Sequence, residues 1–483
     1  MQHAKIPKVI IIGAGPGGLA LYHALIKNKD KKEFDVKIFE RESSPKGKRE
    51  MYKVLSVIEL AFKTLPTFYL KIDRWQGYHI GLNTRGIRSL LNCTTSSVAS
   101  NLTKAIPDPL PDVEFHGISI IDHAGNLLLR PPTKQVQNLQ EIVKIPDDFS
   151  VIISYRDRLR DVLLDGVSVQ WGKKCIGYEE TKEGVWVTFD DGSQEFCDIL
   201  VGADGINSPV RKQRLPELQI FDYGVTHVNT NVAVPKNLMD RIIKLHGNSL
   251  LQKSLGLHGD ASLVTFRLIP IDDYKENSDY NEPYYRATIN YSYPAKLDDV
   301  ESDKIKVDDN DSASVIEHVK QMIRKLRPEG ETTEILLELW DLAPKAIPID
   351  LEKYPFKTYI PTQRRNYRDI NPSSVSHWIS SRVTLLGDAV HAMNPILGLG
   401  TNNAIQDADL LSQALINSSS EDFISSIQGY ENEMRKRASA DVLKSRTAAL
   451  KMSVPVGLFW SIIRNSILKA VNFILNILNT FAK

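Results

Sequence analysis

Three carboxylates in this 483-residue sequence stand where an apolar run ends, and two of them have glycines beside them. Glu40 ends DVKIFE, Asp204 follows ILVGA, and Asp388 follows VTLLG. A carboxylate in such a position could accept hydrogen bonds from the hydroxyl groups of a nucleotide. The alternative for Asp204 is an Asx-type turn that caps a strand, and taken by itself this is the more common role. Asp388 by itself could also be interpreted as a catalytic acid.

The turn before the first of these carboxylates carries the pattern GxGxxG at Gly13, Gly15 and Gly18. In this pattern the first glycine permits a tight turn, the second lets backbone N–H groups approach a pyrophosphate, and the third lets helix and strand pack closely. The positive end of the following helix then faces the phosphates. We predict dinucleotide binding, with Glu40 on a ribose that carries no phosphate; the alternative is an ordinary glycine-rich turn.

The expected elements place these residues in an α/β fold. The first strand, the glycine turn, the helix and the second strand together fill about thirty residues, which is the size of a βαβ unit. Alternation and turn residues predict a hairpin in GVWVTFDDGSQEFC. Strand-forming runs such as TFRLIP and RATINYSYP predict an antiparallel sheet further along. The expected segments are strands at 9–12, 35–40 and 199–201, a strand and helix from 151, and the antiparallel sheet between 215 and 345.

Three motifs together resemble the class A flavoprotein monooxygenases of the para-hydroxybenzoate hydroxylase type. They are GAGPGG with FER at Glu40-Arg41, LVGADGINSPVR, and RVTLLGDAVHAMNP. They occur in the family's order over nearly the whole chain, which is similar to the short fungal and bacterial members. The resemblance implies a Rossmann-like FAD-binding domain, an antiparallel-sheet substrate domain and C-terminal helices.

The resemblance also implies which residues hold the cofactor. Asp388 would bond a ribityl hydroxyl, and Arg156 would contact FAD, with Arg158 and Arg160 as competing neighbours. Asp204 belongs to a motif that supports flavin and nicotinamide nucleotide binding. Thr401 or Asn402 can cap the helix that follows the glycine loop. The expected cofactor-binding residues are Gly13, Gly15, Gly18, Glu40, Arg41, Arg156, Asp204, Gly387, Asp388, Pro395, Gly398, Gly400 and Thr401.

No side chain is nominated as catalytic, because FAD carries the chemistry in this family, and no metal is expected. His391 is expected to be a packing residue. The implied activity consumes NAD(P)H and inserts one oxygen atom from O₂ into a small aromatic or polycyclic organic substrate through a flavin C4a-hydroperoxide. The alternatives are a flavin-dependent reductase or oxidase of the same fold, and a degenerate FAD-binding protein without turnover.

The expected domain limits follow the motifs. Residues 1–214 form the first part of the FAD-binding domain, 215–345 the substrate domain, 346–453 the rest of the FAD-binding domain, and 454–483 an amphipathic tail. Residues 49–73 are an insert relative to the family pattern. The insert could be a lid helix, a membrane-facing segment or a gene-model error.

The net charge and the cysteines of the chain indicate which partners and which compartment to expect. The 60 basic and 59 acidic residues give a net charge of +1, which predicts no nucleic-acid partner. The three cysteines lie far apart, which fits a reducing compartment and a cytoplasmic enzyme.

The tail from 454 to 483 is apolar except for a stripe of polar residues at helical spacing. Three interpretations remain open: a helix packed on the protein's own core, an amphipathic helix on a membrane surface, and a membrane span. The stripe consists of Ser461, Asn465, Lys469, Asn472, Asn476 and Asn479.

Overall fold

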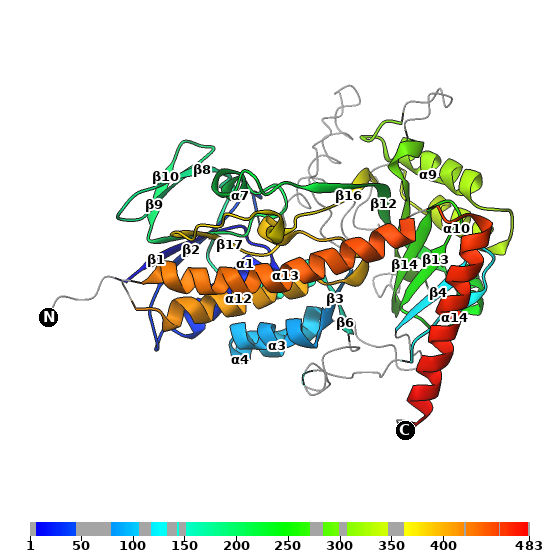
Figure 1. The fold of residues 1–483 in the computed structure, drawn as a ribbon, viewed down its shortest axis with the longest axis horizontal. Coiled ribbons are helices and arrows are strands. Elements are labelled where there is room, and N and C mark those ends of the chain that lie inside the picture. The colour runs from blue at the N-terminus through cyan, green and yellow to red at the C-terminus, as the bar shows by residue number, and fades with distance from the viewer. Residues whose placement is uncertain are drawn as a thin grey trace, which may run out of the picture.

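The computed structural model describes residues 6–44, 79–105, 117–132, 143, 151–270, 284–298, 307–345, 362–419, 422–453 and 455–481. The insert at 49–73 lies outside the described residues. The remaining chain forms two main sheets joined by long helices (Figure 1).

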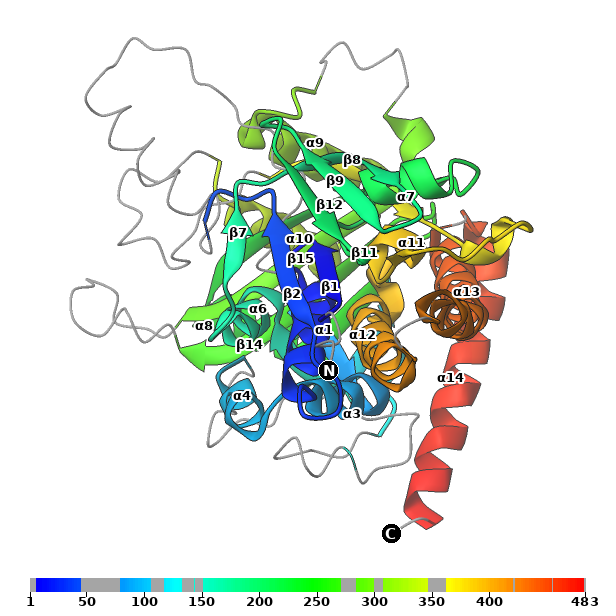
Figure 2. The same cartoon turned by 90° about the vertical axis from the view of Figure 1, so that its left-hand side faces the viewer.

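The first sheet is parallel, and its five strands lie in the order β17-β11-β1-β2-β7. Its central strands are continuous apolar runs, as expected for strands buried on both faces. Helices α1 (Pro16–Lys27), α3 (Thr84–Cys93) and α12 (Gly400–Asn417) pack against one another beside this sheet (Figure 2). The strands are β1 (Lys8–Ile12), β2 (Asp35–Glu40), β7 (Val169–Trp171), β11 (Ile199–Gly202) and β17 (Val383–Leu385).

The described residues also form two small antiparallel sheets. One pairs β3 (His79–Asn83) with β6 (Val151–Tyr155), which leads directly into α6 (Arg156–Leu164). The other contains the predicted hairpin, which is confirmed. Its strands are β8 (Cys175–Glu180), β9 (Val185–Phe189) and β10 (Gln194–Cys197).

The second large sheet has seven strands in the order β16-β12-β15-β14-β13-β4-β5. All neighbouring pairs are antiparallel except β13 and β4. Helices α8 (Lys236–His246), α9 (Ser312–Leu326) and α10 (Glu331–Asp341) share an apolar cluster with one face of this sheet. The strands are β4 (Ile118–Asp122), β5 (Leu127–Leu129), β12 (Phe221–Pro235), β13 (Leu251–Leu255), β14 (Ala261–Pro270), β15 (Tyr284–Pro294) and β16 (Arg364–Asp369).

The antiparallel sheet predicted between residues 215 and 345 is therefore present. Strands β4, β5 and β16 join it from outside that range. The domain limits stay a prediction. A single continuous range such as 215–345 cannot contain the whole seven-stranded sheet, because three of its strands come from other parts of the chain.

Two long helices end the chain. Helix α13 (Phe423–Ser453) runs from beside α12 to the seven-stranded sheet, and α14 (Gly457–Phe481) then descends along the edge formed by β5 (Figure 1). The short helices are α4 (Ser96–Asn101), η1 (Leu102–Ala105), α7 (Pro209–Arg214), η3 (Ala295–Leu297), η4 (Pro372–Ser374), α11 (Asp388–His391) and η5 (Pro395–Leu397).

Candidate cofactor site

The glycine turn between β1 and α1 is closed against the end of β11. Gly13 has φ +111°, and a Cβ built on it would lie 2.4 Å from the carbonyl oxygen of Ala203. A Cβ on Gly18 would lie 2.1 Å from the carbonyl oxygen of Gly13. Only glycine fits these positions, because any side chain would collide with backbone that cannot swing away. The turn therefore lies directly beside the segment that carries Asp204.

Glu40 points from the end of β2 into the same turn. One carboxylate oxygen accepts a hydrogen bond from the Ala14 N–H at 2.8 Å, and the other accepts one from the Glu42 N–H at 3.1 Å. Arg160 holds this arrangement from α6, because it donates to the Ala14 carbonyl at 2.8 Å and to Glu42 at 2.7 Å. The carboxylate is thus fixed at the position that the βαβ pattern predicts for a ribose contact.

The structure separates the three neighbouring arginines of α6. The Arg156 guanidinium lies over the turn, 3.9 Å from where a Cβ on Gly15 would be. Arg158 is exposed and lies over the ring of Tyr155. Arg160 binds protein groups of the turn, as described above. Arg156 is accordingly the arginine placed to face a bound pyrophosphate, and its cofactor role stays a prediction.

Asp204 is the residue whose surroundings most clearly require a ligand. Both of its carboxylate oxygens are enclosed and form no hydrogen bond of good geometry among the described residues, although the nearby Ser208 hydroxyl lowers the pKa of this carboxyl group. Burial raises the pKa of this carboxyl group to about 6. A buried carboxylate without partners is costly, on the order of 1–3 kcal/mol or more. Hydrogen-bond donors of a bound ligand would remove this cost.

Asp388 begins α11 at the end of β17, in the loop that is poor in side chains. A Cβ on Gly400, the first residue of α12, would lie 3.8 Å from one Asp388 carboxylate oxygen. Gly387 and Gly398 both have positive φ, 61° and 63°. The loop between them contains η5, whose first residue is Pro395. The start of α12, which includes Thr401, therefore lies close to Asp388.

These placements form two groups at the carboxyl edge of one parallel sheet, which is where open α/β sheets bind nucleotides. The enclosed carboxylate of Asp204 and the open space beside Gly15, where only the Arg156 guanidinium lies within 4 Å of a Cβ, both fit FAD. Arg41 follows Glu40 with an exposed side chain. The turn group consists of Gly13, Gly15, Gly18, Glu40, Arg41, Arg156 and Asp204, and the loop group of Gly387, Asp388, Pro395, Gly398, Gly400 and Thr401.

The expectation that Thr401 or Asn402 caps α12 is wrong. The N-cap residue is Leu399, which makes no side-chain capping hydrogen bond. Asn402 instead accepts a hydrogen bond from the Asn83 N–H at 2.9 Å and donates to the Gly81 and Gly398 carbonyls at 2.7 and 2.8 Å. It therefore ties the glycine loop to β3. No local sequence pattern predicts this role, because β3 lies more than three hundred residues away in the chain.

His391 is fully buried and belongs to a charged network that the sequence did not suggest. Its Nε2 lies 2.5 Å from Asp407 Oδ2, and Arg437 donates to the other Asp407 oxygen at 2.6 Å. Burial would raise the pKa of Asp407, but His391 and Arg437 outweigh it and lower the pKa to about 2. Asp407 also accepts from the Gly387 N–H at 2.8 Å. The network fixes the backbone before Asp388, and the role of His391 as a packing residue stays a prediction.

A row of polar side chains lies on the face of the seven-stranded sheet opposite α8, α9 and α10. Asn290 donates to Asn229 at 2.6 Å, Thr288 donates to Asn231 at 2.8 Å, and Asn229 bonds His227 at 2.9 Å. Burial lowers the pKa of His227 to about 3, so the ring is neutral. We call these five residues the polar row.

The polar row adjoins the glycine loop. Tyr367 of β16 stacks on His227 with ring centroids 4.3 Å apart. Tyr367 also packs in one small cluster with Ile396, which belongs to η5 of the loop. Burial raises the pKa of Tyr367 to about 12, so the phenol keeps its proton. The polar row is thus next to the loop that carries the proposed flavin contacts.

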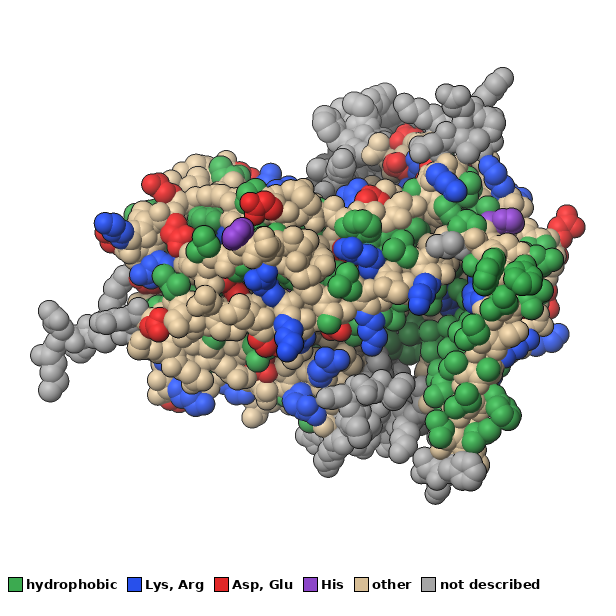
Figure 3. All heavy atoms as spheres, in the orientation of Figure 1, with side chains coloured by type: hydrophobic (Ala, Val, Ile, Leu, Met, Phe, Trp, Pro, Cys, Tyr) green, Lys and Arg blue, Asp and Glu red, His purple; other side chains and the backbone are tan. Residues whose placement is uncertain are grey.

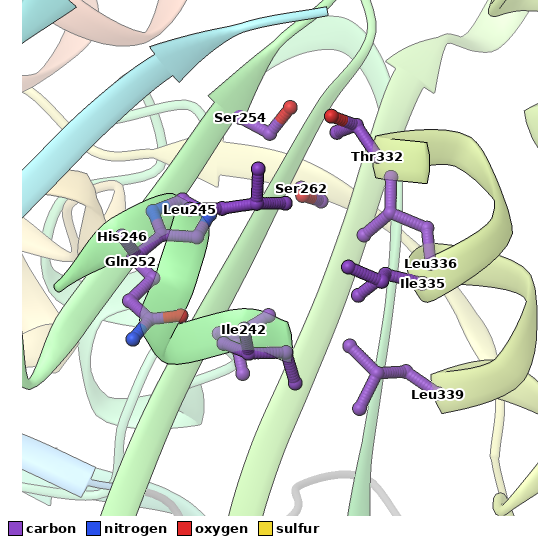
Figure 4. A pocket seen from close by; sticks show the side chains of 11 residues that line it. Ile242, Leu245, His246, Gln252, Ser254, Ser262, Thr332, Ile335, Leu336 and Leu339 are labelled. Atoms are coloured by element: carbon purple, nitrogen blue, oxygen red, sulfur yellow. The ribbon is translucent and has the colours of Figure 1, made fainter. Parts of the chain in front are cut away.

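A different cavity lies on the opposite, helix-covered face of the sheet (Figure 4). It measures about 20 Å³, which is room for about one water molecule. His246 on its wall bonds Ser119 at 2.7 Å. Its size and its position away from the glycine loop exclude it as a site for an organic substrate. Its wall includes Ile242, Leu245, Gln252, Thr332, Leu336 and Leu339.

Comparison with known proteins agrees with this geometry. Residues 345–445 match the FAD binding domain family, and residues 10–55 match the FAD-NAD(P)-binding family. The chain is 25% identical over 460 residues to the FAD-dependent monooxygenase thnD of Trichoderma harzianum, covering 92% of this chain and 91% of that protein.

Two solved structures share the fold at a TM-score of 0.64. One is a putative FAD-containing monooxygenase from Photorhabdus luminescens, with 24% identity, covering 92% of this chain and 98% of that one. The other is Klebsiella pneumoniae HpxO complexed with FAD and uric acid, with 20% identity and coverages of 97% and 95%.

The parallel sheet, its glycine turn and these matches define a flavoprotein with a Rossmann-like FAD-binding domain. The chain is similar to FAD-dependent monooxygenases over most of its length, and it is an FAD-dependent oxidoreductase.

Proposed function

We propose that the protein uses NAD(P)H and O₂ to insert one oxygen atom into a small aromatic or polycyclic organic substrate. The observation that carries the assignment is the enclosed carboxylate of Asp204 beside the glycine turn. The names of the relatives support monooxygenation. Bound FAD would supply the redox chemistry that activates O₂.

The side chains of this chain would bind and orient the cofactor. Glu40 is already held by the Ala14 N–H and can accept from ribose hydroxyls. The amides at the start of α1 would face the pyrophosphate with the positive end of the helix. Asp204 and Asp388 would accept hydrogen bonds from further FAD groups. The start of α12 would favour negative charge at the edge of the flavin ring.

We propose that the polar row binds the substrate. Its Asn and Thr groups offer both donors and acceptors, and His227 and Tyr367 remain neutral near pH 7 because burial shifts their pKa values to about 3 and about 12. A neutral, hydrogen-bonding surface suits an aromatic compound that carries hydroxyl or carbonyl groups. The uric acid bound by the Klebsiella protein is a compound of that general kind.

The test is product analysis with purified holoprotein. NAD(P)H oxidation is measured with a panel of phenolic and polycyclic acceptors under ¹⁸O₂, and the masses of the products are determined by mass spectrometry. The proposal predicts substrate-dependent oxidation and one ¹⁸O atom in the product. Oxidation that yields only hydrogen peroxide, or a reduced product without ¹⁸O, would favour the oxidase or reductase. A protein that binds no FAD would favour the degenerate homologue.

We also propose a cytoplasmic enzyme that touches membranes peripherally through its C-terminal tail. Helix α14 is long and apolar enough to cross a membrane by length and composition, over Gly457–Leu478, and only 6% of its most apolar window is buried.

A further inference from the structure

Helix α14 turns its apolar side chains away from the protein. Phe459 and Phe473 are 68% and 67% exposed, and Ile467 and Leu478 are 58% and 59% exposed. Figure 3 shows green, apolar side chains gathered along α14. An ordinary surface helix has the opposite arrangement, with its apolar stripe on the core. The outward apolar face therefore needs a partner other than water.

The polar stripe, by contrast, holds the helix to the seven-stranded sheet. Asn472 accepts from the Arg130 N–H at 2.7 Å beside β5, and Asn465 donates to Asp122 at 3.3 Å. Arg464 donates to the Gly256 carbonyl at 3.3 Å. Leu468 packs on the small apolar cluster of β4, β5 and β13. Two of the six residues of the polar stripe, Asn465 and Asn472, therefore bond groups of the seven-stranded sheet and its flank.

We infer that α14 is an in-plane anchor: its outward apolar face enters the interface of an anionic bilayer while its polar stripe stays bonded to the sheet. This inference deepens the proposed membrane contact and rests on it. A spanning helix of about 33 Å has sufficient length. Spanning would break the contacts of Asn465 and Asn472 and would place Arg464 and Lys469 in hydrocarbon, which is costly.

The charge of the tail and the width of the apolar face of α14 favour a bilayer as the partner. The segment from 454 to 483 contains no acidic residue and three basic ones, Arg464, Lys469 and Lys483. Its charge is complementary to anionic headgroups. The apolar face is also broad, since Phe473 and Leu478 lie about 140° apart around the helix axis. A single partner helix covers a narrower seam, whereas a bilayer surface covers the whole face.

The first experiment measures binding of FAD-loaded full-length protein to phosphatidylcholine vesicles with and without phosphatidylserine. Wild type should float with the vesicles, more so with phosphatidylserine, and high salt should weaken the binding. The double variant Ile467→Asp, Phe473→Asp should lose binding at least about tenfold. Ile379→Asp is the matched control, because Ile379 is 83% exposed elsewhere and should change nothing.

Flavin content and substrate-dependent NAD(P)H oxidation are measured on the same samples. Absent vesicle binding with normal flavin would overturn the anchor alone, whereas normal binding without flavin or turnover would overturn the proposed function alone. A dimer that Phe473→Asp converts to monomer, without any vesicle binding, would make a second copy the partner and overturn the bilayer.

The second experiment separates an in-plane helix from a span. The three native cysteines are buried, so a thiol introduced by Thr480→Cys can be labelled selectively. On intact vesicles, a membrane-impermeant thiol reagent added outside should label it fully. Labelling only after detergent would show that this end had crossed the bilayer, and would overturn the in-plane anchor.

Discussion

The two large sheets of the molecule differ in what they present to small molecules. The parallel sheet presents an edge where backbone approaches backbone, with glycines at Gly13 and Gly18 and carboxylates at Glu40 and Asp204. The seven-stranded sheet presents a face of ordinary Asn and Thr side chains that bond one another. A cofactor edge therefore depends on conformations that few residues allow, whereas the proposed substrate face depends on hydrogen bonds between side chains.

The largest expected effect is at the cofactor edge. Gly13→Ala should abolish flavin binding and cost more than about 4 kcal/mol of stability, because the new methyl would meet the Ala203 carbonyl. Gly166→Ala is the control, since Gly166 also has positive φ but open space around it, and should cost only about 1–2 kcal/mol. Flavin absorbance and thermal unfolding measure both. Equal behaviour of the two variants would contradict the close approach.

A pH titration of the flavin-free protein tests the buried carboxylate. The pKa of Asp204 is about 6 when folded, above its ordinary value of 3.8, so the folded state binds this proton more tightly. Its contribution to stability is complete below pH 3.8 and is lost as pH rises through 6. Above pH 6, Asp204→Asn should be more stable than wild type by at most about 3 kcal/mol. Chemical denaturation across this pH range measures the difference; an identical pH profile in both proteins would oppose the assignment.

The two faces of β12 should respond differently to truncation. Val228→Ala opens a cavity in the helix-covered core and should cost about 2 kcal/mol in the free energy of unfolding. Asn229→Ala should leave the flavin content unchanged and raise the substrate KM about tenfold through lost hydrogen bonding. Denaturant unfolding and steady-state kinetics separate the two effects. An unchanged KM in Asn229→Ala would remove the polar row from the substrate site.

The smallest effect is expected at Arg158, which is exposed on α6 between the two buried arginines. Arg158→Ala should change stability by less than about 0.5 kcal/mol and leave the flavin content unchanged. Arg156→Ala, the paired variant, should weaken FAD retention. If Arg158→Ala lost flavin and Arg156→Ala kept it, Arg158 would be the arginine that faces the cofactor.

The cofactor edge could largely be predicted from the sequence, because its requirements are local. The strand Asp35–Glu40 has the predicted bounds, and the strand before the glycine turn begins one residue earlier than predicted, at Lys8. The contacts of Asn402 could not be predicted, because they join segments that are distant in the chain. The contact between His391 and Asp407 could not be predicted either, because the two residues belong to different helices. The periodicity of the tail identified its polar stripe, but not that the stripe faces the protein.

The most direct test of the comparison is FAD titration of three flavin-free proteins: wild type, Asp204→Asn and Asn229→Ala. The account predicts that Asp204→Asn weakens FAD affinity at least about tenfold, because an amide cannot accept hydrogen bonds on both sides. Asn229→Ala should bind FAD like wild type. The opposite pattern, with normal affinity in Asp204→Asn and weakened affinity in Asn229→Ala, would contradict the division between cofactor edge and substrate face.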